Sequence, residues 1–444
     1  MSGHAAGPLG ILAGAGSYPL EIAAAVTGRG RPVHVVAIDG FAAPETALYP
    51  CERVGLGQLG RMLASFRRAA CLELVIAGGL RRPDLTRIKP DWGVIRHLPS
   101  ILQLTRGGDD SVLRRVVQFF EKQGFVVRGA ADVAPELLAG AGPIASRRPD
   151  GLQLKAIARA VAALRTLGAF DVGQAAVATP ERVVALESVR GTDAMLAALG
   201  PGGAADGAAR DGVLVKLAKP GQEMRVDLPA IGPTTIEGAV AAGLAGLAVS
   251  AGQAIVLERA QLVAQADQAG LFVQGLDMPP LSGDLPSATF VDPYKLTPLS
   301  VLARRAPTPW ERRDIGIGRQ LAVALAKLDL GRAAVVAGEH VLAVSASLDV
   351  PTMLALIGRD SQWGRRLFKS QLGTLVLDLG QRSQETPTDL DGLVSLEVFA
   401  AAKAARLAGV VCLGAKLPEA RRDEIIGWAN DARLYLLAEE SLHG

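Results

Sequence analysis

Short apolar runs alternate with segments of helical periodicity over the first 150 residues. The run Leu9–Ala13 is followed by a glycine turn and an apolar helix, and a β-branched run covers Val33–Ile38. Helical segments then precede two further runs, Leu72–Ala77 and Phe125–Gly129. Strands that alternate with helices of this length predict a parallel sheet covered on both faces. We therefore expect an α/β fold with a Rossmann-like N-terminal domain over residues 1–149.

The alternation continues over residues 150–275, where we expect a second α/β domain. A helical segment, Leu152–Leu167, precedes the predicted strands Gly173–Ala178 and Arg182–Ser188, and another strand follows at Val213–Leu217. Five prolines then fall between positions 279 and 298, too many for a helix or a central strand. Residues 276–300 are therefore predicted to be a Pro-rich linker.

The C-terminal part, residues 301–444, repeats the middle domain. Asp171–Gly200 aligns without a gap with Asp329–Gly358 at an offset of 158, and 12 of these 30 positions are identical. The apolar pattern is kept, whereas polar positions drift: Glu187 corresponds to Ser345 and Lys216 to Leu377. We interpret residues 301–444 as a degenerate duplicate that fills a packing role. Residues 150–275 are called the first copy and residues 301–444 the second copy.

Composition narrows the class of protein. The chain has 444 residues, of which 49% are hydrophobic and 20% are charged, so a disordered chain is excluded. The net charge of +3 gives no reason to expect a nucleic-acid partner. Three cysteines without a CxxC motif and five scattered histidines argue against a disulfide framework, a structural zinc and histidine-ligated metal chemistry.

An uncharged stretch over residues 238–257 has about the length that spans a bilayer. It is mostly Ala and Gly and contains Ser250 and Gln253, so we expect a buried helix, a turn and a strand instead. The N-terminus shows no basic region before an apolar run. These features predict a cytoplasmic protein.

Gly14 and Gly16 follow the first predicted strand in a turn that also contains Ser17, before the next predicted helix. Such a turn can present backbone N–H groups to a phosphate, although a tight turn without a ligand is the alternative. Arg82 in a loop could pair with phosphate, and Asp110 and Gln58 have either a binding role or a helix-capping role.

The first copy contains the densest group of charged residues. Glu187 ends a predicted strand, and Thr192 and Asp193 begin a helix after a glycine. Further along, Lys216, Lys219 and Arg225 surround Asp227 in the sequence. Cations at this density suit a polyphosphate, and a carboxylate among them can hold Mg²⁺ or orient water. A surface ion network is the alternative.

In their order along the chain, these motifs resemble those of the LpxI family, the UDP-2,3-diacylglucosamine pyrophosphatases of lipid A biosynthesis. The resemblance covers about residues 8–275, and the second copy resembles a degenerate copy of the family's C-terminal domain. The stretches that carry it are Gly10–Gly16, Arg82-Pro83, Gly108–Asp110, Asp171–Gln174, Gly191–Asp193, Lys219–Gln222 and Val226–Gly232.

The resemblance implies a Mg²⁺-dependent hydrolysis of the pyrophosphate in UDP-2,3-diacylglucosamine to UMP and 2,3-diacylglucosamine 1-phosphate (lipid X). It places the family's essential aspartate at Asp227, as a metal ligand or a general base, with Lys219 and Arg225 as further catalytic residues. Asp193 and Glu187 are the other expected metal ligands. The expected substrate-binding residues are Gly14, Gly16, Ser17, Gln58, Arg82, Asp110, Thr192 and Lys216.

The resemblance also implies where and with what the protein works. The expected partner is the acylated sugar nucleotide, and the expected location is the cytoplasm. Peripheral contact with the inner membrane and a homo-oligomer are both left open.

One position departs from the family pattern. Arg190 precedes Gly191-Thr192-Asp193, where the family usually has an acidic residue. If that acid binds metal, this chain has lost a ligand, although Asp193 and Asp227 favour an active enzyme. Two alternatives are a nucleotide-cofactor oxidoreductase, suggested by the glycine turn and Asp39, and a non-catalytic partner in lipid A assembly.

Overall fold

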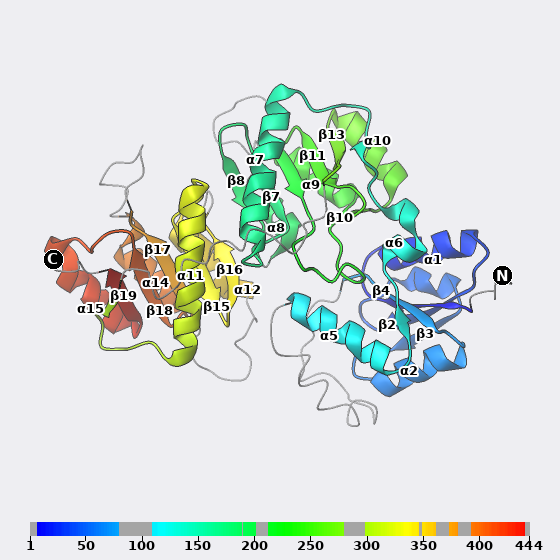
Figure 1. Cartoon of the computed structure of the whole chain (residues 1–444), viewed down its shortest axis with the longest axis horizontal. Helices are drawn as coiled ribbons and strands as arrows, with labels where there is room; N and C mark the ends of the chain where they lie inside the picture. The colour runs from blue at the N-terminus through cyan, green and yellow to red at the C-terminus, as the bar shows by residue number, and fades with distance from the viewer. Residues whose placement is uncertain are drawn as a thin grey trace. The chain divides into compact units, whose positions relative to one another are not determined.

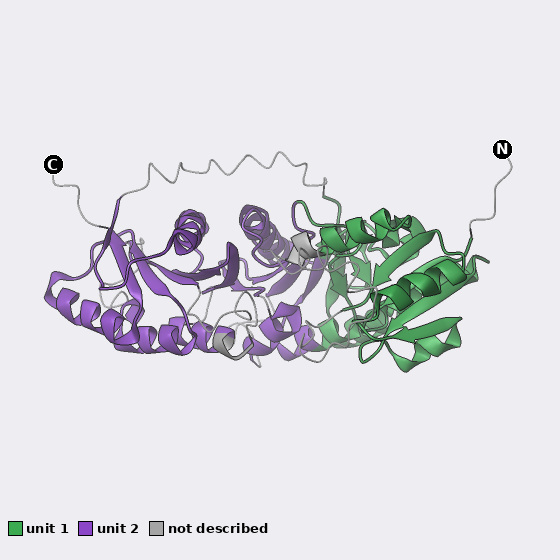
Figure 2. Ribbon diagram, turned by 90° about the horizontal axis from the view of Figure 1, so that it is seen from below, with its two compact units in different colours: residues 1–148, 221–237, 249–278 green, residues 149–220, 238–248, 279–444 purple. Residues whose placement is uncertain are grey.

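The computed structural model describes residues 7–79, 109–188, 190–200, 212–278, 298–345, 349–360, 373–380 and 392–439. The chain forms two compact units (Figure 2). Unit 1 consists of residues 1–148, 221–237 and 249–278, and unit 2 consists of residues 149–220, 238–248 and 279–444. Each unit is described separately below.

Unit 1 contains a five-stranded parallel sheet, and four of its strands lie in the predicted apolar runs (Figure 1). The strand order is β3 (Cys51–Val54), β2 (Val33–Ile38), β1 (Leu9–Ala13), β4 (Glu73–Ala77), β5 (Val126–Val127). Strand β3 is an element that the sequence analysis did not predict. The parallel pairing and strand order confirm the Rossmann-like α/β domain.

Helices cover both faces of this sheet because successive strand residues point to opposite sides. Leu9 and Ile11 of β1 pack with α1 (Tyr18–Gly28), whereas Leu12 packs with α2 (Leu59–Arg68) and α5 (Asp109–Lys122). The other described elements of unit 1 are η1 (Pro44–Leu48), α6 (Ala130–Val133), η3 (Pro135–Leu137), β6 (Gly142–Pro143), β10 (Ala230–Ile231), β12 (Ile255–Val256), α10 (Arg259–Ala269) and β13 (Phe272–Leu276).

The part of the first copy that lies in unit 2 is built around an antiparallel strand group. Strand β7 (Ala175–Ala178) pairs with β8 (Val183–Leu186) on one side and β9 (Val213–Lys216) on the other. Helix α7 (Gly151–Gly168) packs on these strands, and α8 (Gly191–Ala198) follows β8. The unit boundary passes through α9 (Pro233–Ala241) and β11 (Gly246–Ser250).

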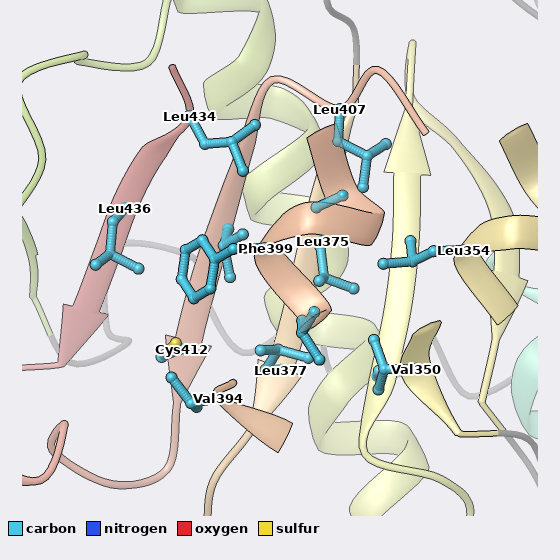
Figure 3. Packing of buried hydrophobic residues seen from close by; sticks show 14 of the residues in the cluster. Val350, Leu354, Leu375, Leu377, Val394, Phe399, Leu407, Cys412, Leu434 and Leu436 are labelled. Carbon is cyan, nitrogen blue, oxygen red and sulfur yellow. The ribbon is translucent and has the colours of Figure 1, made fainter. Parts of the chain in front are cut away.

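The second copy forms a six-stranded mixed sheet in the order β14-β19-β18-β17-β15-β16. Its strands are β14 (Leu299–Val301), β15 (Ala333–Ala337), β16 (His340–Val344), β17 (Thr374–Asp378), β18 (Gly409–Leu413) and β19 (Tyr435–Glu439). Its helices are α11 (Pro309–Lys327), α12 (Val350–Asp360), α14 (Leu396–Ala404), η5 (Glu419–Arg421) and α15 (Arg422–Ala432). Figure 3 shows the apolar core, in which Leu375, Phe399 and Leu436 belong to one buried cluster.

The two copies share strand register as well as sequence. Ala176 pairs with Leu186, and Ala334 pairs with Val344, both at the offset of 158. Each hairpin also has a register shift at the same place, after Val177 and after Val335. Within unit 2, α7 contacts its counterpart α11. The structure therefore supports a duplicated α/β domain.

The uncharged stretch 238–257 has the structure expected from its composition. It contains the end of α9, a turn, β11 and β12. Within the described part of the chain, no helix combines the length and the apolar character that crossing a membrane requires.

Candidate functional site

Asp227 lies in a tight turn of unit 1 that the neighbouring residues hold in place. The backbone N–H groups of Val226 and Asp227 both donate to the carbonyl oxygen of Glu223 at 3.0 Å. The side chain of Val226 packs against the apolar cluster that includes residues of α2 and α5. Nε2 of the buried Gln222 donates to Oδ2 of Asp227 at 2.6 Å. The half-buried Asp227 carboxylate is therefore oriented and still partly accessible.

Arg225 belongs to an ion network that ties this turn to α5. Its guanidinium binds both carboxylate oxygens of Glu223, at 2.7 and 2.8 Å, and Glu121 of α5 at 2.7 Å. The hydrogen bonds with Glu223 raise the pKa of Arg225, and the Arg225 guanidinium lowers the pKa of Glu223. Because two carboxylates already neutralise this cation, the contacts favour a positioning role over phosphate binding.

A close backbone approach also holds Arg225 in place. A Cβ atom added at Gly129 would lie 3.1 Å from the Cα of Arg225, so a larger residue there would displace the turn that carries Asp227.

In unit 2, Glu187 connects two elements of the first copy. Its Oε1 accepts a hydrogen bond from the hydroxyl of Thr192 at 2.6 Å, and its Oε2 accepts one from the N–H of Gln174 at 2.7 Å. Glu187 and Thr192 are buried, and Asp193 lies in the first turn of α8. With both oxygens of Glu187 engaged, these contacts favour a structural role for its carboxylate over metal binding.

Lys216 and Lys219 of the first copy lie at and just after the end of β9. Lys216 is 8% exposed, and Lys219 Nζ donates to Asp171 Oδ1 at 2.7 Å. Asp171 itself adopts a left-handed conformation, with φ of 56°. Asp171, Gln174 and Gln222 belong to motifs that are visible in the sequence, but the sequence predicts no role for them. Their polar side chains were the only indication in the sequence that they could belong to a site. Their partners could be identified only in the folded structure.

The glycine turn of unit 1 pairs with a second glycine segment. The N–H groups of Gly14 and Ala15 donate to the carbonyl oxygens of Ala77 and Gly79 at 2.8 Å. A Cβ atom at Gly14 would lie 2.8 Å from the carbonyl oxygen of Gly78, and Gly16 has φ of 92°. These contacts favour the alternative of a tight strand-to-helix turn, because two of its amides are used within the fold.

The remaining expected binding residues make local contacts or lie outside the residues that the structure describes. The hydroxyl of Ser17 donates to Glu21 at 3.1 Å, and burial raises the pKa of that carboxyl. Oε1 of Gln58 accepts the N–H of Gly55 at 3.0 Å and so closes a turn. Arg82 lies outside the described residues, as does the side chain of Asp110 in the first turn of α5.

The described residues contain no group of three or more His, Cys, Asp or Glu side chains arranged to hold a metal ion. Asp227 lies in unit 1, whereas Asp193 and Glu187 lie in unit 2, and their shared role as metal ligands stays a prediction.

Comparison with models of known protein families identifies the family of this chain. The model described as the LpxI N-terminal domain matches residues 8–137, and the LpxI C-terminal domain model matches twice, at residues 140–274 and 298–437. The chain belongs to the LpxI family. The double match confirms that this LpxI chain carries a duplicate of its C-terminal domain.

A curated relative supports the same assignment. The LpxI chain is 40% identical over 272 residues to a Caulobacter vibrioides protein named UDP-2,3-diacylglucosamine pyrophosphatase LpxI. The match covers 61% of this chain and 97% of the relative. The findings support an LpxI-family hydrolase of lipid A biosynthesis.

These findings correct the reaction expected from the sequence. That expectation specified hydrolysis to UMP and lipid X, with an oxidoreductase and a non-catalytic partner as alternatives. The relative is named a pyrophosphatase, and neither this name nor the LpxI family match supports a more detailed reaction. The detailed reaction is therefore replaced by the coarser assignment to the LpxI hydrolases, and the oxidoreductase alternative is wrong.

Proposed function

We propose that the chain is a Mg²⁺-dependent UDP-2,3-diacylglucosamine diphosphatase. The proposal draws on the name of the 40% identical relative and on the carboxylate of Asp227. The observation that carries it is the geometry of this carboxylate, which Gln222 orients from one side while the side chain remains partly accessible.

Hydrolysis of a diphosphate needs a water molecule to be positioned and deprotonated. A bond forms between the water oxygen and one phosphorus, the bridging P–O bond breaks, and the proton of the water passes to an acceptor. An oriented carboxylate can accept that proton or hold a cation beside the diphosphate. Gln222 donates to Oδ2 and so restricts rotation of the Asp227 carboxylate.

The carboxylate of Asp227 suits Mg²⁺ as one of its ligands. Mg²⁺ is usually bound through one or two carboxylates together with substrate phosphates and water. When bound, Mg²⁺ would neutralise charge on the diphosphate and polarise its oxygens. The proposal does not include Glu187 because both of its oxygens accept hydrogen bonds within unit 2.

The lysines at the end of β9 suit the charge of the substrate. A diphosphate ester is anionic, and a cation in a mostly buried place interacts with it more strongly than one in water. Lys216 is buried and Lys219 is mostly buried, so both meet this condition. The substrate also carries two acyl chains. We propose that the reaction takes place in the cytoplasm and that the protein contacts the inner membrane peripherally.

The test is incubation of the purified full chain with UDP-2,3-diacylglucosamine, followed by ³¹P NMR. With Mg²⁺, we expect the diphosphate resonances to be replaced by those of two phosphate monoesters. With EDTA in place of Mg²⁺, we expect the substrate to persist. A substrate that stays intact in Mg²⁺ would contradict the proposed activity, and equal turnover in EDTA would contradict the metal dependence alone.

A further inference from the structure

A shallow pocket lies in unit 2 beside the last turns of α7 and the end of β9. It is lined by Leu164, Arg165, Gly173, Gln174, Leu217, Ala218 and Lys219. Two of these side chains are cations, and one is an amide. The sequence alone predicts no role for Arg165.

The pocket brings together two cationic side chains, those of Arg165 and Lys219. Lys219 pairs with Asp171 at 2.7 Å. Nε of Arg165 is buried and has no hydrogen-bond partner among the described residues. A buried donor without a partner is destabilising, and an anionic acceptor would satisfy it.

The second copy shows that the fold does not require these cations. At the corresponding positions, Arg165 is replaced by Val323 and Lys219 by Gly380, whereas Asp171 is kept as Asp329. The strand register around the site is unchanged, since Ala175 pairs with Lys216 and Ala333 pairs with Leu377.

In the second copy, a side chain of the chain itself forms hydrogen bonds at the corresponding place. Gln174 corresponds to Arg332, whose Nη1 donates to the carbonyl oxygens of Asp378 and Gly380 at 2.9 and 2.7 Å. The second copy thus uses a side chain to satisfy backbone acceptors there. In the first copy, two cations occur instead, and Arg165 retains an unsatisfied donor.

We propose that this pocket of the first copy binds a phosphate group, with Arg165 and Lys219 as its ligands. An arginine presents planar donors that match phosphate oxygens, and a lysine adds a compact charge. The phosphate group comes either from the diphosphate of the substrate or from free phosphate. The first source rests on the proposed function, whereas binding itself does not.

The direct test is titration of the full chain with inorganic pyrophosphate at about 0.15 M salt in EDTA, by isothermal calorimetry. We expect Arg165→Gln to raise the Kd at least ~10-fold, equal to about 1.4 kcal/mol. Lys155→Gln is the matched control because it removes one positive charge from an exposed position of the same helix. We expect it to change the Kd less than about twofold, as distant exposed charges are screened.

Arg165→Lys tests the geometry of the contact and covers the case in which Arg165→Gln does not fold. It keeps the charge but loses the planar donors, so we expect an intermediate Kd. An unchanged pyrophosphate Kd in a folded Arg165→Gln would overturn the proposal. Where only Arg165→Lys folds, a Kd equal to that of the unaltered chain would do the same.

The source of the phosphate is distinguished by steady-state turnover of UDP-2,3-diacylglucosamine. A KM raised in parallel with the pyrophosphate Kd in Arg165→Gln identifies the substrate's diphosphate. An unchanged KM with a raised pyrophosphate Kd identifies free phosphate. If the unaltered chain does not hydrolyse the substrate, the proposed function fails, and the calorimetric titration still decides whether the pocket binds phosphate.

Discussion

The two copies of the C-terminal domain share a fold and differ in their polar residues. The hairpins β7–β8 and β15–β16 have the same register and the same register shift. The capping boxes of α7 and α11 also correspond, with Asp150 and Thr308 as N-caps. At the end of β9, however, Lys216 and Lys219 become Leu377 and Gly380. The difference teaches that apolar pattern and caps maintain this fold, while the charged residues are dispensable for it.

Individual contacts show how the second copy compensates. Glu187 in the first copy binds Gln174 N–H and the Thr192 hydroxyl. Ser345 in the second copy accepts the equivalent N–H of Arg332, at 3.2 Å, and that of Ala333, at 2.9 Å. Val350 replaces Thr192, so no second acceptor is needed. A shorter side chain therefore satisfies the same backbone.

Elsewhere, polarity increases in the second copy. Its buried Tyr435 and Thr374 are hydrogen-bonded to each other, and Arg305 lies over the Tyr435 ring at 5.3 Å. The first copy has the buried apolar residues Phe272 and Val213 at these positions. The two side chains therefore match each other in both copies: the first copy has an apolar pair, and the second copy has a hydrogen-bonded polar pair.

The sharpest test of the comparison replaces Lys216 and Lys219 with the second copy's residues. For Lys216→Leu/Lys219→Gly, we expect kcat/KM to fall by at least ~10³, because charge stabilisation of this kind is often the largest catalytic contribution. The melting temperature should stay within a few degrees, because Leu377 occupies the same strand position. Lys327→Leu, at an exposed position of α11, is the control and should retain full turnover. Unchanged turnover in the double variant would contradict the assigned difference.

The reverse substitution tests the apolar side of the comparison. Leu377→Lys would bury an ammonium group in a fully apolar cluster, and we expect it to lower the free energy of unfolding by about 3–5 kcal/mol. Urea denaturation measures this change. Leu396→Lys, at a position that is 57% exposed, should stay within about 0.5 kcal/mol. Equal stability of the two variants would show that the second copy tolerates the charge.

The pair Glu187 and Thr192 should behave as one unit. Glu187→Ser should cost about 1–3 kcal/mol of unfolding free energy, because it removes a buried acceptor. Adding Thr192→Val should cost little more, since the two side chains share one hydrogen bond at 2.6 Å. A double-mutant cycle by urea denaturation gives the coupling. Fully additive costs would contradict the shared contact.

The polar pair of the second copy should show a smaller effect of the same kind. Tyr435→Phe or Thr374→Val alone should cost about 1–2 kcal/mol by leaving one buried hydroxyl without its partner. The double variant reproduces Phe272 and Val213 and should lie closer to the unaltered chain than either single variant. Thermal or urea unfolding of the four proteins checks this order. A double variant that is less stable than both single variants would contradict it.

The smallest effect concerns Cys412, which corresponds to Val249 in the first copy. Cys412→Val nearly conserves volume and should change stability by less than about 1.5 kcal/mol. Burial raises the pKa of the Cys412 thiol to about 12. Cys412 should therefore react with a thiol reagent far more slowly than the half-buried Cys51. Mass spectrometry of the labelled protein distinguishes the two sites. Equal labelling rates in the folded chain would contradict the buried position.

Most of the fold could be predicted because its strands are continuous apolar runs. Leu9–Ala13 and Val33–Ile38 form strands with the predicted bounds. Strand β3 was missed because Glu52 and Arg53 interrupt a segment of only four residues. Its strand structure depends on pairing with β2, which is a tertiary contact.

The chemistry-bearing residues were visible in the sequence, but their partners were not. Asp227, Lys216 and Lys219 could be selected as charged residues in one segment. Arg225 was expected to bind phosphate because Glu121, far away in the sequence, could not be recognised as its partner. Arg165 lies outside every motif, and its proposed role follows from a buried Nε beside Lys219.

The account depends on Asp227 acting on the diphosphate bond. The most direct test compares turnover of UDP-2,3-diacylglucosamine by the full chain and by Asp227→Asn, with Asp277→Asn as an exposed control of equal charge change. We predict that kcat falls at least ~10³-fold in Asp227→Asn at an unchanged melting temperature, while the control keeps its turnover. Retained turnover in a folded Asp227→Asn would contradict the central claim.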